Sequence, residues 1–423
     1  MKKMKIFLSV LVLFSSFACK DFVSDVAPYT DRVNIDELND QASVDFLING
    51  LVNQLSLTVD RTFLTGDLLA DQLIFDPRNT KATFLAYQVI DQGSPMDNNT
   101  ENTQGFLNAQ ELRLMADTLV YKANNQIKFT DNNIKNRALY AGKFYSAFAY
   151  YLLGTYFGKD QVSGGAPINL SHFKSTTVLY QTAIDKWNEA LNYTTNAYNI
   201  RLINSLIGRI YLFMGDYTNA AIYVAKGLIS GDAPFVAQYN TLSDNYYRLN
   251  AGEVRVQCNV DPRFNTYVTN DPTEAARIQL KKSTFSGASL YSQIKYVLQP
   301  DNVTVTPIVI IDWQENNLME AELAVRGNMA GNPVSLINAV RASRINPTTK
   351  LPVSSLSSST AITLADPTTS TTYSIYVERD KELWLRGDRL IDERRFGKFH
   401  LQGMWEYLPI PYSEKIQNPY WNN

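Results

Sequence analysis

The sequence predicts a mostly α-helical protein, with about four helical hairpins interrupted by long irregular insertions that carry a few short strands. Three observations support this prediction. Apolar residues recur at intervals of three and four within paired segments, as they do along one face of a helix. Small residues stand where paired helices need close contact. Stretches without helical periodicity separate the pairs.

The clearest pair covers residues 201–230, where two apolar stripes flank Gly215 and Asp216. The spacing of Gly208, Tyr211, Gly215, Tyr217 and Ala220 resembles that of a tetratricopeptide repeat, a helix-turn-helix unit. One such unit buries its apolar face only against neighbouring units. The other predicted pairs are 44–59 with 109–127, 136–157 with 178–193, and 316–327 with 333–343.

The N-terminus has the features of a lipoprotein export signal. Three lysines precede an apolar run over residues 6–14, which is too short to cross the roughly 30 Å core of a bilayer. Ala18 directly before Cys19 is typical of cleavage and acylation at that cysteine; an ordinary cleaved signal with an incidental cysteine is the alternative. We expect a signal peptide at 1–18, an extended tether at 19–40 and a membrane lipid anchor that does not span the bilayer.

The composition is that of an exported domain that folds on its own core. With Cys19 acylated, Cys258 has no cysteine with which to form a disulfide. Of the 423 residues 45% are hydrophobic, so residues 41–423 can form one large domain. The formal net charge of -2 argues against nucleic acid as a partner, since nucleic-acid binding requires a basic face.

The predicted insertions cover residues 62–105, 234–307 and 346–372. Loops of this length inside a compact domain are usually functional or disordered. Alternating apolar residues at 253–260 and 303–311 predict brief strands within the second insertion. The third insertion is rich in Ser, Thr and Pro, which is typical of a surface loop.

The C-terminal segment 375–397 places charged residues at helical spacing, with a break near Gly387. The charges at 392–395 are expected to form a solvated face or a structural network. This segment resembles the C-terminal signature of the SusD/RagB family of outer-membrane lipoproteins. The residues that carry the resemblance are 137–138, 150–158, 166–168, 319–322, 337–341, Glu378, Arg379, Glu382, Leu383, Gly387, Arg389 and 395–397.

The resemblance to this family implies a cell-surface binding lipoprotein of the outer membrane that has no enzymatic activity and no cofactor. Such a protein captures oligosaccharide or similar polymer fragments and delivers them to a SusC-like TonB-dependent barrel transporter. The alternative is a helical-repeat scaffold that binds a protein partner or a peptide and no glycan, because the face of a repeat protein is commonly a docking surface.

Catalytic motifs are not evident in the sequence. His172 and His400 are isolated, and neither a HExxH zinc motif nor a Gly-x-Ser-x-Gly elbow is found. The 41 acidic residues include no marked pair of the kind that hydrolyses glycosidic bonds. We therefore expect binding chemistry and no metal or catalytic residues.

Glycan capture requires several exposed aromatic rings. One ring stacked on a sugar contributes roughly 1.5 kcal/mol, whereas millimolar affinity needs about 4 kcal/mol. Most of the five tryptophans, and the tyrosines at 140, 145, 150, 151 and 156, are expected in the core. The candidate ligand-binding residues come from the first two insertions, with packing of Tyr246 and Tyr247 onto the hairpins as the alternative. They are Asp71, Gln72, Arg78, Tyr87, Tyr246, Tyr247 and Arg248.

Overall fold

The computed structural model describes residues 38–365 and 371–421. The expected signal peptide, Cys19 and the tether as far as residue 37 lie outside the described residues. The described chain is mostly helical, as the sequence predicts, and its short strands form small sheets. No helix in this part of the chain combines the length and the hydropathy that spanning a bilayer requires.

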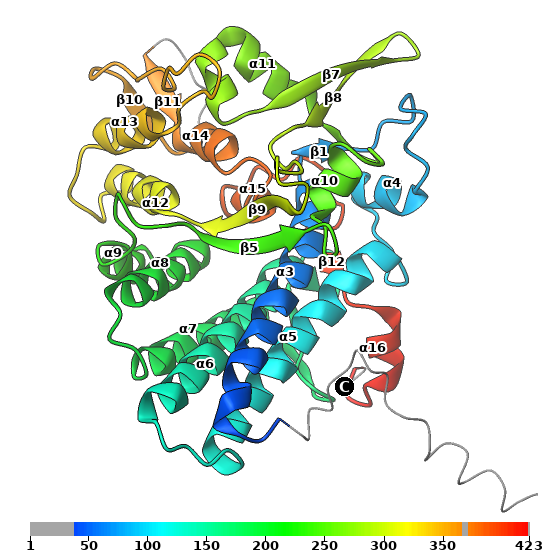
Figure 1. The fold of residues 1–423 in the computed structure, drawn as a ribbon. Helices are drawn as coiled ribbons and strands as arrows, with labels where there is room; N and C mark the ends of the chain where they lie inside the picture. Colours follow the sequence, from blue (N-terminus) through cyan, green and yellow to red (C-terminus); the bar gives the residue numbers. More distant parts are fainter. Residues whose placement is uncertain (1–37, 366–370, 422–423) are drawn as a thin grey trace, which may run out of the picture.

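Four helical hairpins within the described residues form the body of the molecule and confirm the four predicted pairs. Figure 1 shows them stacked from the blue and teal helices, through the green pair, to the yellow pair. The hairpins are α3 (Val44–Leu69) with α5 (Thr100–Asn125), α6 (Asn132–Tyr156) with α7 (Thr176–Leu191), α8 (Ala197–Met214) with α9 (Tyr217–Val224), and α12 (Trp313–Val325) with α13 (Pro333–Ser343).

Helix α3 continues to Leu69, well past the predicted end at residue 59. Its second half is buried on all sides and contains polar residues, so it shows no amphipathic period. Thr58 Oγ1 donates to Gln54 O at 2.7 Å and Thr65 Oγ1 donates to Arg61 O at 2.8 Å. Because these hydroxyls are satisfied within the helix, polar residues fit where the sequence pattern indicated a loop.

The turn between α8 and α9 forms as the sequence predicts. Gly215 ends α8 with φ +76°, a left-handed conformation that glycine adopts without strain. Asp216 then caps α9 by accepting from Asn219 N at 3.1 Å. Gly208 brings the two helices together, because a Cβ at this position would lie 2.6 Å from Val224 Cγ2.

We expect Gly208→Ala to lower the free energy of unfolding by about 1–3 kcal/mol, because Val224 and its backbone must move away from the added methyl group. Urea denaturation measures the change. Gly50→Ala is the matched control, since its Cβ would meet only the flexible end of Met115 at 3.4 Å. This control is expected to be neutral or to stabilise the helix by about 0.5–1 kcal/mol. Equal effects of the two substitutions would contradict the close packing of α8 on α9.

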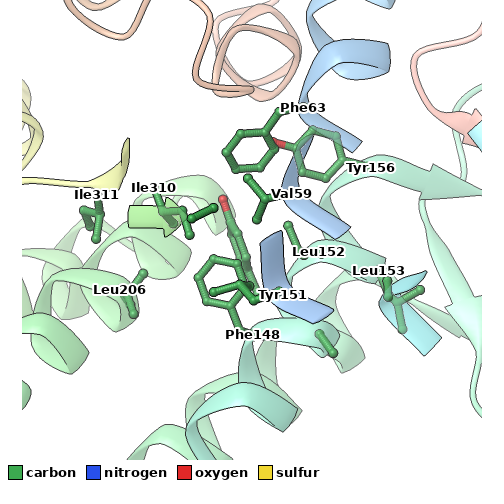
Figure 2. Close-up of a cluster of buried hydrophobic side chains, with 14 of the residues drawn as sticks. Val59, Phe63, Phe148, Tyr151, Leu152, Leu153, Tyr156, Leu206, Ile310 and Ile311 are labelled. Atoms are coloured by element: carbon green, nitrogen blue, oxygen red, sulfur yellow. The ribbon is translucent and has the colours of Figure 1, made fainter. Parts of the chain in front are cut away.

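A main core joins the hairpins, and a smaller cluster of Leu318, Ala321, Ile337, Val340 and Ile375 packs α12, α13 and α14 (Ile375–Glu382) together. Figure 2 shows Val59 of α3, Phe148 and Tyr151 of α6, Leu206 of α8 and Ile310 of β9 gathered in one cluster, and all of these residues are buried. Tyr150, Tyr151 and Tyr156 are buried, as predicted, whereas Tyr140 and Tyr145 are half-buried against the core. Trp187 and Trp384 are fully buried as well, whereas the tryptophans at 313, 405 and 421 are half-buried.

The insertions are folded against the hairpins. The first contains β1 (Leu73–Ile74) and α4 (Leu85–Asp91), and the third contains β10 (Ala361–Thr363) and β11 (Thr372–Ser374). The second contains β5 (Phe235–Asn240), α10 (Tyr246–Ala251), β6 (Asn259–Val260), α11 (Pro262–Asn270), a 3-10 turn at Pro272–Ala276, β7 (Leu280–Phe285), β8 (Ala288–Gln293) and β9 (Thr304–Ile311). Strand order β1-β6-β8-β7 joins the first two insertions in one sheet, and β5 pairs antiparallel with β9.

The two strand predictions for the second insertion have different outcomes. The strand predicted at 303–311 is confirmed as β9. Of the strand predicted at 253–260, only Asn259–Val260 forms, because the chain turns at Val256, which has φ +46°. A left-handed residue cannot continue an extended strand.

The C-terminal segment forms α14 (Ile375–Glu382) and α15 (Arg389–Arg395), separated at Gly387 as predicted. Arg395 donates to Asp392 at 2.7 Å and to Glu322 of α12 at 2.6 Å. The charges at 392–395 therefore form a structural network, mostly buried, and not a solvated face. The chain then continues through β12 (Leu408–Pro409), which pairs parallel with β2 (Phe157–Gly158), to α16 (Tyr412–Gln417). A small pair of strands, β3 (Gly165–Pro167) and β4 (Phe173–Ser175), precedes α7.

Candidate functional site

Three of the seven candidate ligand-binding residues are buried. Gln72, Tyr87 and Tyr247 are each at most 1% exposed. Their expected place on an exposed surface is therefore corrected. The physical reason is that the insertions pack onto α3, α5 and the C-terminal segment, where these side chains satisfy buried polar groups. Gln72 Oε1 accepts from Leu385 N at 2.6 Å, and the Tyr87 hydroxyl donates to Glu101 at 2.8 Å.

Tyr247 is a core residue at the point where α10 meets α3. Its ring stacks on Tyr296 with centroids 5.2 Å apart, and its hydroxyl donates to Asp67 Oδ2 at 2.5 Å. Burial raises the pKa of the Asp67 carboxyl to about 8, so this side chain is mostly protonated at neutral pH. The tyrosine holds the second insertion on the helical body and does not face solvent.

Asp71 is held in ion pairs. Arg389 Nε lies 2.6 Å from Asp71 Oδ1, and Arg263 Nη2 lies 2.7 Å from the same oxygen. Burial opposes ionisation, but the two guanidinium groups dominate and hold the pKa of Asp71 well below its usual value. This carboxylate therefore ties β1 to α11 and α15.

The other three candidate residues reach the surface. Arg78 is exposed and pairs with Asp76. Tyr246 is half-buried beneath Arg61, whose guanidinium lies 3.6 Å from the centroid of the tyrosine ring. Arg248 pairs with Glu253 at 2.8 Å. Their part in ligand binding stays a prediction.

The structure brings the first two insertions together, as the candidate set requires. Gln257 Oε1 accepts from Thr83 N at 2.8 Å and from Phe84 N at 2.9 Å, while its Nε2 donates to Lys81 O at 2.8 Å. Asn79 Nδ2 donates to Val256 O at 2.8 Å. Residues 79–84 are thus fixed against the chain between α10 and β6.

A cleft of ≈ 360 Å³ opens beside this junction. Figure 1 shows the β7–β8 hairpin projecting away from the helical body, above α10 and α4. We call the space between the hairpin and the α10–β6 connection the hairpin cleft. It is lined by Lys81, Gly252, Glu253, Val256, Lys281, Ser283, Phe285, Ser292, Gln293 and Ile294.

The alternation of the hairpin strands sets which side chains enter the hairpin cleft. Lys281, Ser283 and Phe285 alternate along one face of β7, and Ser292 stands opposite Lys281 on β8. Gln293 secures the hairpin to α10, since its Nε2 donates to Tyr247 O at 3.1 Å. A Cβ at Gly252 would collide with that Nε2, so glycine allows the close approach.

The hairpin cleft combines an apolar ring with hydrogen-bonding groups. Phe285 is half-buried, and the ammonium groups of Lys81 and Lys281 are exposed. Glu253 is the one carboxylate among the described lining residues, and Arg248 already pairs with it. Hydroxyls, ammonium groups and a ring suit a neutral polar ligand with an apolar face. Within residues 38–365 and 371–421, no cluster of three or more His, Cys, Asp or Glu side chains is arranged to hold a metal ion.

Reasoning from sequence missed Lys81, Lys281 and Phe285. A signal for the turn does exist, because Ser286-Gly287 is a dipeptide that favours a turn. Nothing local indicates that this hairpin stands beside residues 79–84, because the contact depends on the β1-β6-β8-β7 sheet.

The fold is that of the SusD superfamily, in agreement with the resemblance seen in the sequence. Solved structures with this fold include a SusD superfamily protein from Bacteroides thetaiotaomicron, with TM-score 0.69 and 18% identity over 90% of this chain and 98% of that chain. NanU of B. fragilis has TM-score 0.68 and 15% identity over 93% of this chain and 98% of that chain.

A third similar structure is surface glycan-binding protein A from Bacteroides thetaiotaomicron in complex with laminarihexaose. It has TM-score 0.58 and 14% identity over 90% of this chain and 98% of that chain. At such identities the similarity shows the fold alone. No protein-family model and no curated protein matches this chain.

Proposed function

We propose that this protein is a noncatalytic lipoprotein that captures oligosaccharide at the cell surface and passes it to a TonB-dependent barrel transporter. The observation that carries the binding step is the hairpin cleft, where a ring, two ammonium groups and two serine hydroxyls converge from both long insertions. The volume of the hairpin cleft, ≈ 360 Å³, is within the usual range for small-ligand sites, about 300–1,000 Å³. The laminarihexaose complex of a protein with this fold supports glycan as the ligand class.

The content of the hairpin cleft supports binding without hydrolysis. A glycosidase places two carboxyl groups on either side of the scissile bond, roughly 5–10 Å apart. Glu253 stands alone in the lining of the hairpin cleft and is engaged by Arg248 at 2.8 Å. A sugar bound there meets hydrogen-bond partners and a ring, but no pair of acid and base.

The lipid anchor and the transporter are proposed from the N-terminal residues and from the family resemblance. Mass spectrometry of protein extracted from membranes tests the first, because cleavage before Cys19 must leave an acylated N-terminus. Purification of the chain from native membranes tests the second, with a large barrel protein expected to accompany it.

Phe285→Ala tests the hairpin cleft directly. We expect about tenfold weaker oligosaccharide binding, because loss of one stacked ring removes roughly 1.5 kcal/mol. Isothermal titration of the mature protein with laminarihexaose and a panel of other oligosaccharides measures the affinity. The melting temperature should change little, since the ring is half-buried at the end of a hairpin.

Lys226→Met is the control for this experiment, because Lys226 is exposed after α9, outside the hairpin cleft. If wild type and Phe285→Ala bind oligosaccharide with equal affinity, the glycan binds at another surface and not in the hairpin cleft. If no oligosaccharide binds the wild-type protein, the scaffold for a protein partner or peptide becomes the better explanation.

A further inference from the structure

A second cavity, of ≈ 180 Å³, lies beneath the third insertion, where the 3-10 turn at Pro272–Ala276, β9 and the α14–α15 connection meet. We call it the cationic cavity, because four of its lining side chains are basic. It is lined by Ala276, Arg277, Gln279, Lys295, Val309, Arg344, Glu382 and Arg386. Its volume can hold several waters, each of which occupies about 30 Å³ in the liquid.

The one acidic residue of the cationic cavity is already neutralised. Arg277 Nη1 lies 3.1 Å from Glu382 Oε2, and Arg344 Nη2 lies 2.5 Å from Glu382 Oε1. Two guanidinium groups therefore share this carboxylate on its two oxygens. Carboxylates outside the lining also pair with its arginines, since Arg277 contacts Glu378 and Arg386 contacts Asp312, so Lys295 is the cation of this lining that has no carboxylate partner among the described residues.

Lys295 has no carboxylate partner within the described residues. Its ammonium group donates to the carbonyl oxygen of Trp384 and forms no ion pair there. Burial, together with the neighbouring cations Arg386 and Arg344, lowers the pKa of Lys295 to about 7. A buried cation in this position is one that an added negative charge would stabilise.

Arg386 lines the same cavity, and both of its terminal nitrogens are paired. Its Nη1 pairs with Asp312 at 3.0 Å and its Nη2 with Glu315 at 3.2 Å. Its Nε is enclosed by the protein and does not face the cationic cavity. Arg386 therefore contributes positive charge to the cavity wall, and Lys295 contributes the available donor.

We propose that the cationic cavity binds a small monovalent anion of carboxylate size, held by Lys295 beside the guanidinium groups of Arg344 and Arg386. A free anion can supply this group, and so can the carboxylate of an acidic sugar. An acidic sugar could bind next to the cationic cavity, because Gln279 lines both this cavity and an adjoining groove of ≈ 340 Å³ beside Tyr291 and Ile294. This groove lies on the opposite face of the β7–β8 hairpin from the hairpin cleft.

Bromide provides the direct test on the wild-type protein. Crystals grown or soaked in sodium bromide at pH 6, where Lys295 is mostly protonated, should show an anomalous peak in the cationic cavity within hydrogen-bond distance of Lys295 Nζ. An empty or water-filled cationic cavity at high bromide concentration would overturn the proposal. This result does not depend on any variant or on glycan binding.

Lys295→Met, which removes the charge and keeps most of the side-chain length, tests the site in solution. At pH 6 we expect acetate affinity to fall by at least about tenfold relative to wild type. Lys226→Met, an exposed lysine outside the cationic cavity, should leave it unchanged. Circular dichroism establishes that both variants are folded, and equal acetate affinity in a folded Lys295→Met would contradict the assignment.

Glucuronate, acetate and glucose separate the two sources of the anion. Tighter binding of glucuronate than of acetate, lost in Lys295→Met, supports a ligand carboxylate. Binding of acetate and glucuronate with equal affinity supports a free anion. If glucose and glucuronate bind with equal affinity, and neither acetate nor bromide binds, the anion site is overturned. The proposed capture of glycans would remain in place.

Discussion

Glu378→Gln is expected to lower the free energy of unfolding by about 3–5 kcal/mol, since it leaves the buried guanidinium group of Arg341 without its counter-charge and removes one of the counter-charges of Arg277. Glu378 is fully buried and accepts from Arg277 Nη1 at 2.8 Å, from Arg341 Nη2 at 2.6 Å and from the Tyr373 hydroxyl at 2.8 Å. These three donors come from the second insertion, from α13 and from β11. The carboxylate therefore joins three parts of the chain.

Urea denaturation at pH 7 measures this loss, and Glu189→Gln is the matched control. Glu189 is half exposed and pairs only with Lys143 at the surface, so its substitution should cost less than about 1 kcal/mol. A cost for Glu378→Gln no larger than that of the control would show that the buried network does not stabilise the fold.

The same carboxylate predicts how stability depends on pH. Burial opposes its ionisation, but Arg277 and Arg341 hold the pKa of Glu378 well below its usual value. A pKa lowered in the folded state gives a stabilisation that is present above the unfolded pKa, about 4.3, and lost as the pH falls below it. Wild type should therefore lose more stability than Glu378→Gln between pH 6 and pH 3, and parallel profiles would contradict the role of Glu378.

Tyr247→Ala is expected to cost about 3–5 kcal/mol of unfolding free energy, because it empties a fully buried site. The substitution also removes the ring stacked on Tyr296 and the hydroxyl that donates to Asp67. This follows the alternative that the sequence left open, in which Tyr247 packs onto the hairpins.

Tyr246→Ala is the neighbouring control, since this ring is half-buried and lies against the guanidinium group of Arg61. We expect a cost of about 1 kcal/mol or less. Differential scanning calorimetry of both variants separates the two positions, with a large fall in melting temperature for Tyr247→Ala alone. Similar melting temperatures would mean that α10 does not pack on α3 as described.

The helical hairpins could be predicted from the sequence because the patterns that indicate them are local. Apolar stripes at intervals of three and four, and glycines at turns, reflect contacts between residues close in the chain. The C-terminal end of α3 could not be predicted, although its start at Val44 was. Its second half is enclosed by α5, α10 and α15, so polar residues such as Thr65 and Asp67 lie inside and leave no amphipathic pattern.

The sequence by itself determined the stacked hairpins, the break at Gly387 and the resemblance to the SusD family, because each depends on short-range spacing or on residue identity. Only the tertiary structure decided that Gln72, Tyr87 and Tyr247 are buried and that Lys81 meets the β7–β8 hairpin. The physical reason is that burial and clefts arise from contacts between segments far apart in the chain, such as β1 with β6, and these contacts leave no periodic signature in either segment.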